Sequence, residues 1–497
     1  MIKARHPKAG FFFAALALLL FFATRAIALD ALPLHNDEGL HLTRAVEVWN
    51  GNPFWEIRDG KIINHWLIAL FYPQNAPVFA GRIATVLVAM PGFAASMALT
   101  RRLGMGAMAL GALLWLASPF IFFYDRMAFS DAQAGALGLL ALWAAMRGED
   151  VPPGSSSLLR AFLTGVLLAL AMLFKFTAAP YALGVALLVL TRRAPLRERL
   201  RTLAIIVGVV AAAFAVPVAV LLWRGSSLFD IALAWVGAGG GSGGLTLLDN
   251  LGRLAGLLLW GSAAWVALLL AGLVAAFAAG ARSVRLLSLA ALLPLLVVLI
   301  LGRDAQSRHF AAVMPPLVAV SGMGWAHLWR SSRSSWLASP SALLAAALLL
   351  IPFAGFAVTT YRSPAALEMP PLMAWQYVEG YASGYGLREA VEAFPQTLTD
   401  TRLQIIGSMY GDSCRRANFY ADAGRTMLCG DAPMRSAIEA ALAHDGAVYV
   451  LVERGGEIGI DVMTVDARAM LLASYPRPHE TEADASVRLW LLERPAG

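Results

Sequence analysis

Charged residues are scarce in this chain. Asp, Glu, Lys and Arg together make up 14% of its 497 residues, whereas hydrophobic residues make up 59%. A soluble domain of this length would carry roughly a quarter charged residues. The deficit is concentrated, because long apolar runs alternate with short charged clusters until about residue 360 and the composition then becomes ordinary. This profile excludes a single soluble domain and is typical of a polytopic membrane domain followed by a soluble one.

Cysteine is nearly absent. The only two, Cys414 and Cys429, both fall in the C-terminal segment. If that segment lies outside the cytoplasm, we expect a disulfide that closes this short loop, and two free thiols are the alternative.

About eleven apolar segments approach the roughly 20 residues that a helix needs to cross a bilayer. They are 10–29, 77–99, 105–123, 131–146, 160–177, 179–191, 203–222, 254–279, 284–301, 310–329 and 335–358. The first resembles a signal peptide but lacks a small-x-small cleavage site followed by a soluble domain, so we interpret it as an uncleaved span.

The positions of arginine and lysine predict the orientation. With a cytoplasmic N-terminus, alternate loops place every strong cluster inside, including Arg101 with Arg102, the segment 191–201, and Arg330 with Arg333. An odd number of spans then places residues 359–497 outside the cytoplasmic membrane. The formal charge of +7 is explained by cations that face anionic lipid head groups, so we expect no nucleic-acid partner.

The outer side carries the longer connections. Loop 30–76 contains two pieces with helical spacing of apolar residues, 39–49 and 64–71, which we expect to lie flat at the interface. The glycine-rich stretch 237–244 lacks the Lys-Ser or Lys-Thr of a phosphate loop, which favours a mobile outer loop. We therefore predict a membrane domain over 1–358, with 30–76 as its catalytic outer loop.

The C-terminal residues 359–497 have a different pattern. Amphipathic helices are predicted at 386–394 and 434–444, and strands at 403–408, 447–454 and 487–494. The prediction is a small extracytoplasmic α/β domain.

Adjacent carboxylates, Asp37 and Glu38, stand just beyond the first span in "ALPLHNDEGLH". One interpretation is a helix start, with Asn36 as the cap and two acids favoured by the helix dipole. The other is that Asp37 is a general base or metal ligand, supported by Glu38 and a histidine.

Other polar residues are predicted at the same outer face. Each has a structural alternative: snorkelling for Lys175, an ion pair for Arg126 with Asp131, and a solvated surface for Asp59 and Lys61. Arg308 and His309 form a further basic pair. Together they pair carboxylates with several cations at head-group level, as a reaction on a lipid-linked phosphate requires.

The same residues stand in stretches that resemble a known family. "HNDEGLH", "DGKIINHWLIAL", "AGRIATVL", "YDRMAFSDA", "LALAMLFKFTAAPYALGVAL" and "SRHFAAVMPPLVAV" follow one another along most of the membrane part. In that order they are similar to motifs of the GT-C glycosyltransferases that use a polyprenyl-phosphate sugar, a group that includes protein O-mannosyltransferases and the lipid A aminoarabinose transferase. The relatives usually have proline after the lysine of the second motif, where this chain has "KII".

The resemblance implies roles for individual residues. Asp37 would be the catalytic carboxylate, with Glu38 beside it, and Lys175 and Arg308 would contact the carrier phosphate. The remaining donor-binding candidates are His309, Asp59, Lys61, Arg126 and Asp131. A divalent metal held by Asp37 and His41 is a further hypothesis.

The implied activity is transfer of a hexosyl or pentosyl group, with inversion, from a polyprenyl-phosphate carrier to an acceptor hydroxyl on a glycan, lipid or protein. Two alternatives stay open. A transporter or flippase of a lipid-linked glycan would need polar residues at the bilayer midplane, of which the predicted spans have almost none. A non-catalytic membrane assembly protein would leave the ordered carboxylates and cations unexplained.

Overall fold

The computed structural model describes two compact units. The residues described are 7–54, 57–71, 75–147, 155–237, 246–260, 262–278, 280–302, 305–331, 340–408, 411–421, 425–429, 434–453 and 465–495. The first unit comprises Met1–Leu29, Val48–Phe71 and Arg82–Tyr361, and the second comprises Asp30–Glu47, Tyr72–Gly81 and Arg362–Gly497. Most of the glycine-rich stretch 237–244 lies outside the described residues.

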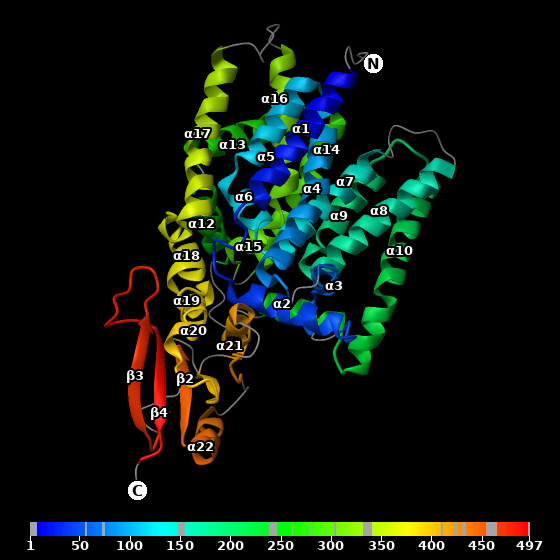
Figure 1. The fold of residues 1–497 in the computed structure, drawn as a ribbon. Coiled ribbons are helices and arrows are strands. Elements are labelled where there is room, and N and C mark those ends of the chain that lie inside the picture. Colours follow the sequence, from blue (N-terminus) through cyan, green and yellow to red (C-terminus); the bar gives the residue numbers. More distant parts are fainter. Residues whose placement is uncertain are drawn as a thin grey trace. The chain divides into compact units, whose positions relative to one another are not determined.

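The first unit is helical. Its elements, including those that lie mostly within it, are α1 Pro7–Ala26, η1 Ile57–Asp59, α3 Ile63–Ala69, α4 Pro77–Arg101, α5 Met105–Leu116, α6 Pro119–Asp125, α7 Ser130–Arg147, α8 Ser155–Phe174, η3 Phe176–Ala178, α9 Tyr181–Leu190, α10 Leu196–Trp223, α11 Leu228–Gly237, α12 Thr246–Leu259, α13 Ala263–Ala278, α14 Arg282–Leu301, α15 Ser307–Ala311, α16 Met314–Ser331 and α17 Pro340–Arg362. Helix α8 packs between α7 and α10, and α16 packs against α13 and α5 (Figure 1).

The number of spans is smaller than the sequence predicts. Among the described residues five helices are long and apolar enough to cross a membrane, or up to seven if each of two bent pairs is one span. The predicted span 105–123 is one such pair, bent by 68° between α5 and α6. Ser118 caps α6 by accepting a hydrogen bond from the Ile121 amide, and Pro119 follows at the first turn, a sequence that starts a new helix. The predicted count of about eleven is therefore not confirmed.

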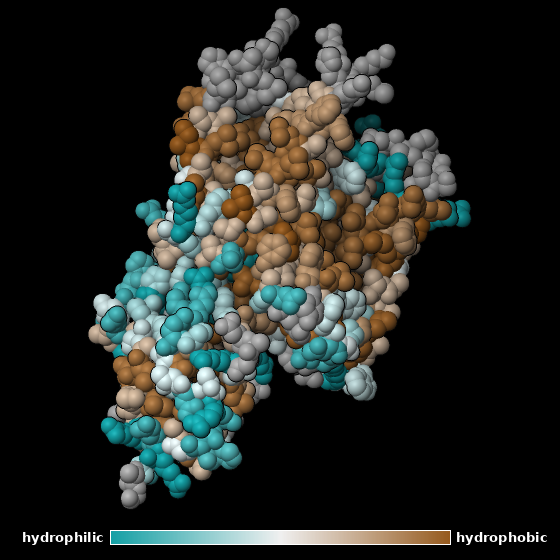
Figure 2. Space-filling model, viewed as in Figure 1, coloured by the Kyte–Doolittle hydropathy of each residue, from teal (hydrophilic) through white to brown (hydrophobic). Residues whose placement is uncertain are grey.

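Apolar side chains cover the outside of this unit. In Figure 2 hydrophobic residues gather over its helices, whereas hydrophilic residues dominate the visible surface of the second unit. Exposed large apolar side chains include Phe162 on α8, Val207 and Leu222 on α10, and Ile300 on α14. An exposed apolar surface of this extent is unfavourable in water and suits contact with lipid.

The second unit combines helices with a four-stranded sheet. Its elements are α2 Asn36–Trp49, of which the last two residues belong to the first unit, η5 Pro364–Ala366, α18 Pro371–Ala374, the π-helical turn η6 Trp375–Glu379, η7 Tyr381–Ser383, α19 Leu387–Glu392, α20 Phe394–Thr397, β1 Ile405–Ser408, α21 Gly411–Ala417, η8 Asn418–Tyr420, α22 Met434–Asp445, β2 Ala447–Glu453, β3 Arg468–Tyr475 and β4 Val487–Glu493. The strand order is β1-β2-β4-β3, with β1 parallel to β2 and the other pairs antiparallel (Figure 1).

Strand β2 is buried on both faces, which explains its continuous apolar sequence. Val448 and Val450 pack with Ile438 of α22, while Tyr449 and Leu451 pack in the cluster on the other face. Alternate side chains point to opposite faces of a strand, so each set builds a separate core. The predicted helices at 386–394 and 434–444 and the three predicted strands are all present, and β3 is an additional strand.

The helices predicted in loop 30–76 are also present. The structure has α2 over Asn36–Trp49 and α3 over Ile63–Ala69, where the sequence predicts helices at 39–49 and 64–71. Most of α2 belongs to the second unit and α3 to the first. The loop 30–76, which the sequence predicts as one piece, is therefore divided between the two units.

Candidate functional site

The first unit holds a cluster of cations at the C-terminal end of α8. The segment 57–62 is joined to this end by two backbone hydrogen bonds, from the Ile62 amide to the Leu173 carbonyl and from the Phe176 amide to the Gly60 carbonyl. Gly60 has a φ of +74°, and a Cβ there would lie 3.0 Å from Phe176, so glycine suits both the turn and the close approach. The two bonded residues Leu173 and Phe176 flank Lys175 in sequence, so these bonds hold the loop that carries Lys61 beside Lys175.

Lys175 forms a buried ion pair. Its Nζ lies 2.6 Å from Oδ1 of Asp131 at the start of α7, and the two side chains are 7% and 2% exposed. Lys61 and Asp59, which pair with each other at 3.2 Å, also interact electrostatically with Lys175. Four of the predicted site residues are therefore brought together, with the Asp59–Lys61 pair more exposed than the Lys175–Asp131 pair.

Arg308 and His309 on α15 complete this cluster. Burial, followed by the charges of Lys175, Arg308 and Lys61, lowers the pKa of His309 well below its usual value. Its Nδ1 accepts a hydrogen bond from the Gln306 amide at 3.2 Å. The Arg308 guanidinium lies 5.8 Å from the ring centre of Phe129, within the range of a cation–π contact. We call Lys61, Lys175, Arg308 and His309, with Asp59 and Asp131, the cation cluster.

Arg126 does not pair with Asp131. Its guanidinium donates to the carbonyl oxygens of Thr24, Arg25, Ile27 and Ala28, at the C-terminal end of α1. Carbonyls at a helix end lack partners within the helix, and an arginine there satisfies them. These contacts favour a structural role for Arg126.

The second unit contains the acidic turn, which we define as residues 35–39 at the start of α2. The His35 amide donates to Oε2 of Glu38 at 3.0 Å, and the Asp37 amide donates to Nδ1 of His35 at 3.1 Å. Glu38 is completely buried, whereas Asp37 is only half-buried. Glu38 therefore closes the first turn of the helix, while Asp37 is the less buried of the two acids.

His41 stands four residues after Asp37 on α2 and is buried. This spacing places the two on one face of the helix. A cation at this position would have these two residues as its candidate ligands, and the described part of the chain contains no group of three or more His, Cys, Asp or Glu residues that is arranged to hold a metal ion. The donor set is therefore smaller than that of a typical protein metal site.

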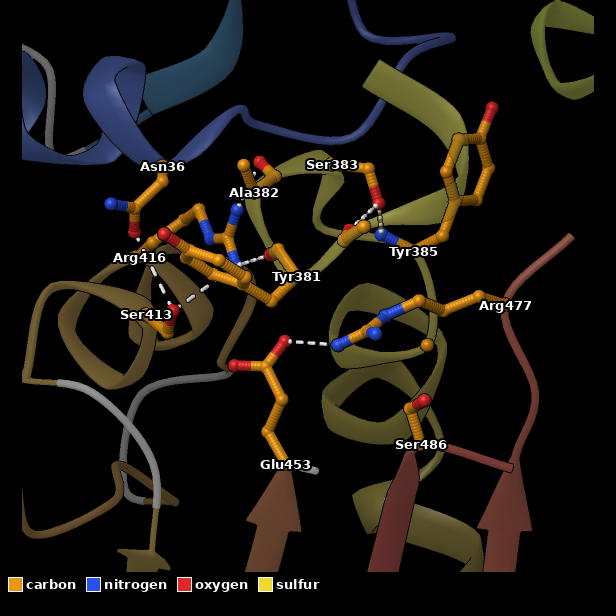
Figure 3. Close-up of polar contacts among 12 residues, drawn as sticks. Asn36, Tyr381, Ala382, Ser383, Tyr385, Ser413, Arg416, Glu453, Arg477 and Ser486 are labelled. Atoms are coloured by element: carbon orange, nitrogen blue, oxygen red, sulfur yellow. Dashed lines mark hydrogen bonds and ion pairs between the residues drawn. The ribbon is translucent and has the colours of Figure 1, made fainter. Parts of the chain in front are cut away.

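Arg416 of α21 lies close to Asn36 at the start of the acidic turn (Figure 3). Its Nη1 donates to the carbonyl oxygens of Leu34 at 3.1 Å and Ala382 at 2.7 Å, and Nη2 donates to that of Tyr381 at 3.0 Å. The Tyr420 hydroxyl accepts a hydrogen bond from the Leu34 amide at 2.6 Å. Sequence reasoning missed both side chains, because nothing in "SCRRANFY" connects it with a motif almost 380 residues earlier.

Buried charges surround Arg416. Glu453, at the end of β2, interacts electrostatically with it and pairs with Arg477 at 2.7 Å. Burial raises the pKa of Glu453, and the two arginines oppose this rise. Cys414, two residues before Arg416, forms a disulfide with Cys429.

Comparisons with known proteins identify the fold. No protein-family model matches the chain, and no curated protein matches its sequence. Among solved structures, ArnT from Cupriavidus metallidurans bound to undecaprenyl phosphate is similar with a TM-score of 0.64 and 15% identity over 97% of both chains. The oligosaccharyltransferase AglB from Archaeoglobus fulgidus, in complex with an inhibitory peptide and a dolichol-phosphate, has a TM-score of 0.54 and 12% identity over 89% of this chain and 69% of its own.

A third similar structure is the arabinofuranosyltransferase AftD from Mycobacteria. It has a TM-score of 0.52 and 16% identity, and the match covers 100% of this chain but 40% of AftD. AglB is an oligosaccharyltransferase and AftD an arabinofuranosyltransferase, and the ArnT and AglB structures contain undecaprenyl phosphate and a dolichol-phosphate, respectively. The chain therefore shares its fold with these three structures, which agrees with the resemblance of its sequence motifs to the GT-C group.

Proposed function

We propose, from the GT-C fold of this chain, that it is a membrane glycosyltransferase that moves a sugar from a polyprenyl-phosphate carrier to an acceptor hydroxyl. The observation that carries the proposal is the cation cluster, in which Lys61, Lys175 and Arg308 all act electrostatically on His309. Positive side chains that are already in place stabilise an anion as it forms, with no further reorganisation. Structures similar to this chain were solved with undecaprenyl phosphate and with a dolichol-phosphate, which supports a lipid phosphate as the ligand.

In the proposed reaction Asp37 removes the proton of the acceptor hydroxyl while the oxygen attacks the anomeric carbon of the sugar. The new glycosidic bond forms as the bond between that carbon and the carrier phosphate breaks, and its electron pair leaves with the phosphate. Attack from the opposite side inverts the configuration. Asp37 suits the role of base better than Glu38, because Glu38 is completely buried and accepts a hydrogen bond from the His35 amide, whereas Asp37 is only half-buried.

The carrier phosphate departs as an anion and needs no general acid. Lys175 and Arg308 would stabilise its charge, with Lys61 and Asp59 beside the sugar or phosphate. A metal held by Asp37 and His41 would help to orient the acceptor oxygen, but two ligands are a poor fit for such an ion, and the proposed reaction does not require one. We place the reaction on the outer face of the cytoplasmic membrane, with residues 359–497 outside, where they would help to select the acceptor.

Asp37→Asn tests the proposal. Purified enzyme in lipid nanodiscs would be assayed with a panel of polyprenyl-phosphate sugars, and we expect the variant to lose at least about 100-fold in kcat, since general-base catalysis contributes roughly 10²- to 10⁴-fold. The matched control is Asp30→Asn, the same change at an exposed carboxylate seven residues earlier. Near-normal turnover by a folded Asp37→Asn enzyme would show that Asp37 is not the base.

The sugar can be identified separately. Deletion of the gene should cause the lipid-linked donor to accumulate, and mass spectrometry of extracted lipids would give the mass of its sugar. An unchanged lipid profile together with no transfer by the purified protein would contradict the glycosyltransferase assignment.

A further inference from the structure

We propose that Arg416 is a positioning residue for the transfer reaction, holding the acidic turn so that the carboxylate of Asp37 meets the acceptor hydroxyl. The inference rests on the proposed function, because it assigns Arg416 the task of orienting the proposed base. It also gives α21 and the disulfide that anchors it a part in catalysis. Every contact that carries it lies within the second unit.

The first contact fixes the chain where it enters the acidic turn. Leu34 is held at both of its backbone groups, since Arg416 donates to its carbonyl oxygen and Tyr420 accepts from its amide. Leu34 itself is completely buried. The peptide before His35 therefore has little freedom to rotate, and the direction in which α2 begins is set by α21 and η8.

The second contact fixes the turn where it becomes a helix. A Cβ built on Gly39 would lie 2.6 Å from Cβ of Arg416, a separation that real side chains do not adopt. The backbone of Gly39 thus rests directly on the stem of Arg416. One arginine thus contacts Leu34, just before the acidic turn, and Gly39 at its end, with Asp37 between these two residues.

Arginine is required here by the number and direction of the acceptors. One guanidinium bridges the carbonyls of Leu34, Ala382 and Tyr381, and so ties the acidic turn to η7. Its planar fork presents five donors, whereas the lysine ammonium is a point charge with three. The buried Glu453 also interacts electrostatically with Arg416 and favours its charged form, opposing the effect of burial.

The element that carries Arg416 is itself anchored. The Cys414–Cys429 disulfide joins α21 to the segment 425–429. The Asn418 side chain makes two hydrogen bonds with the backbone of Met427, at 2.9 and 2.8 Å. The backbone that carries Arg416 is thus tied to the segment 425–429, which limits its movement, as a positioning residue requires.

The experiment compares four variants of the full-length enzyme. Arg416→Gln removes the bridge, and Tyr420→Phe removes a single hydroxyl while keeping the ring. Arg477→Gln breaks the ion pair with Glu453 without touching the acidic turn. Arg402→Gln replaces an arginine whose side chain is 88% exposed and paired with Asp400.

Two readouts are measured on each variant. The first is the separate determination of kcat and donor KM, and the second is hydrogen–deuterium exchange of the peptide that spans 32–42. We expect Arg416→Gln to lower kcat by about 10- to 100-fold with little change in donor KM, because a small displacement of a reacting group costs this much. Tyr420→Phe should lower kcat by a smaller factor, and both should speed exchange in the acidic turn.

Arg477→Gln measures the effect of lost stability alone. We expect it to lower Tm while kcat stays within about twofold and exchange of 32–42 stays unchanged, since the Arg477 side chain pairs with Glu453 and Glu480 rather than with the acidic turn. Arg402→Gln should change neither. If Arg416→Gln does not fold, the Tyr420→Phe enzyme carries the test.

The outcomes separate this inference from the proposed function. Normal kcat and exchange in both Arg416→Gln and Tyr420→Phe, with Asp37→Asn inactive, would overturn the positioning role and leave the base in place. Equal kcat losses in Arg416→Gln and Arg477→Gln at equal Tm would show that Arg416 acts only through stability. An active Asp37→Asn enzyme would instead reject the proposed function.

Discussion

Lys175 forms an ion pair with Asp131 in this structure, which complicates any test of its proposed contact with the carrier phosphate. Its ammonium lies 2.6 Å from Asp131, and both groups are buried. Removal of one member of such a pair costs about 3 to 5 kcal/mol, because the other is left as an uncompensated buried charge. A loss of activity in a single Lys175 variant would therefore mix two effects, one on folding and one on the donor phosphate.

A double variant separates them. We expect Lys175→Met and Asp131→Asn each to lower Tm, while Lys175→Met with Asp131→Leu regains most of the stability, since apolar replacements of a buried ion pair are often neutral. Sugar transfer should stay low in the double variant if Lys175 contacts the carrier phosphate. Thermal unfolding in detergent and the transfer assay measure the two properties.

An exposed ion pair provides the matched control. Arg435 and Glu439 on α22 pair at 2.8 Å with both side chains about half exposed, and such pairs contribute little. Changing them to Met and Leu should leave Tm and transfer nearly as in the wild type. Full activity in the Lys175→Met, Asp131→Leu enzyme would show that Lys175 is purely structural.

His309 predicts how stability depends on pH. Its pKa in the folded protein is well below the usual 6.5, first because of burial and then because of Lys175, Arg308 and Lys61. Below pH 6.5 the unfolded chain binds a proton at this histidine and the folded chain does not. The contribution of His309 is therefore fully present above 6.5 and is lost progressively as the pH falls.

The check is Tm measured between pH 5 and 8. Wild-type Tm should fall on the acid side, and His309→Gln should flatten that slope because the titrating group is gone. His444→Gln, at an exposed histidine, is the control substitution. An acid slope that is the same in wild type and His309→Gln would show that other groups cause it.

Individual residues show where sequence reasoning ends. The residue types of the cation cluster could be predicted, because basic residues recur where apolar runs end. Their pairing could not: Asp131 follows Arg126 closely in sequence, yet it pairs with Lys175, 44 residues away, and Arg126 binds the end of α1. Arg416 carried no signal at all, because its partners are backbone carbonyls, which every residue has.

At the scale of elements, the helices and strands with a buried face were predicted and the irregular ones were not. Strand β2 has an apolar run because it is covered on both faces. Strand β3 was missed because it is an edge strand in which Met470 and Leu471 are exposed, so no alternation marks it.

The membrane helices show the same limit. Hydropathy located apolar stretches correctly, but it does not register a break such as the one at Ala117 and Ser118, where one predicted span becomes two helices. Nor does it separate a long span from a short helix such as α9, whose ten residues extend only about 15 Å. The length of each folded helix, rather than the apolar composition of its sequence, decides whether the segment can cross the bilayer.

For the whole molecule the main prediction is its orientation in the membrane. Arginine clusters between apolar segments, including 191–201, favour the cytoplasmic side. The Cys414–Cys429 disulfide favours an oxidising compartment for the C-terminal part. The two arguments are independent, because one uses charges of the first unit and the other a covalent bond in the second.

Reporter fusions test this orientation. Alkaline phosphatase is active only outside the cytoplasm and green fluorescent protein fluoresces after folding inside it, so the first should be active when fused after residue 445 and the second should fluoresce when fused within 191–201. A fusion of each reporter at the other site is the control and should be silent. The reverse pattern would place the C-terminal part in the reducing cytoplasm, where the disulfide would not persist and an outer-face reaction would lack its proposed acceptor-selecting domain.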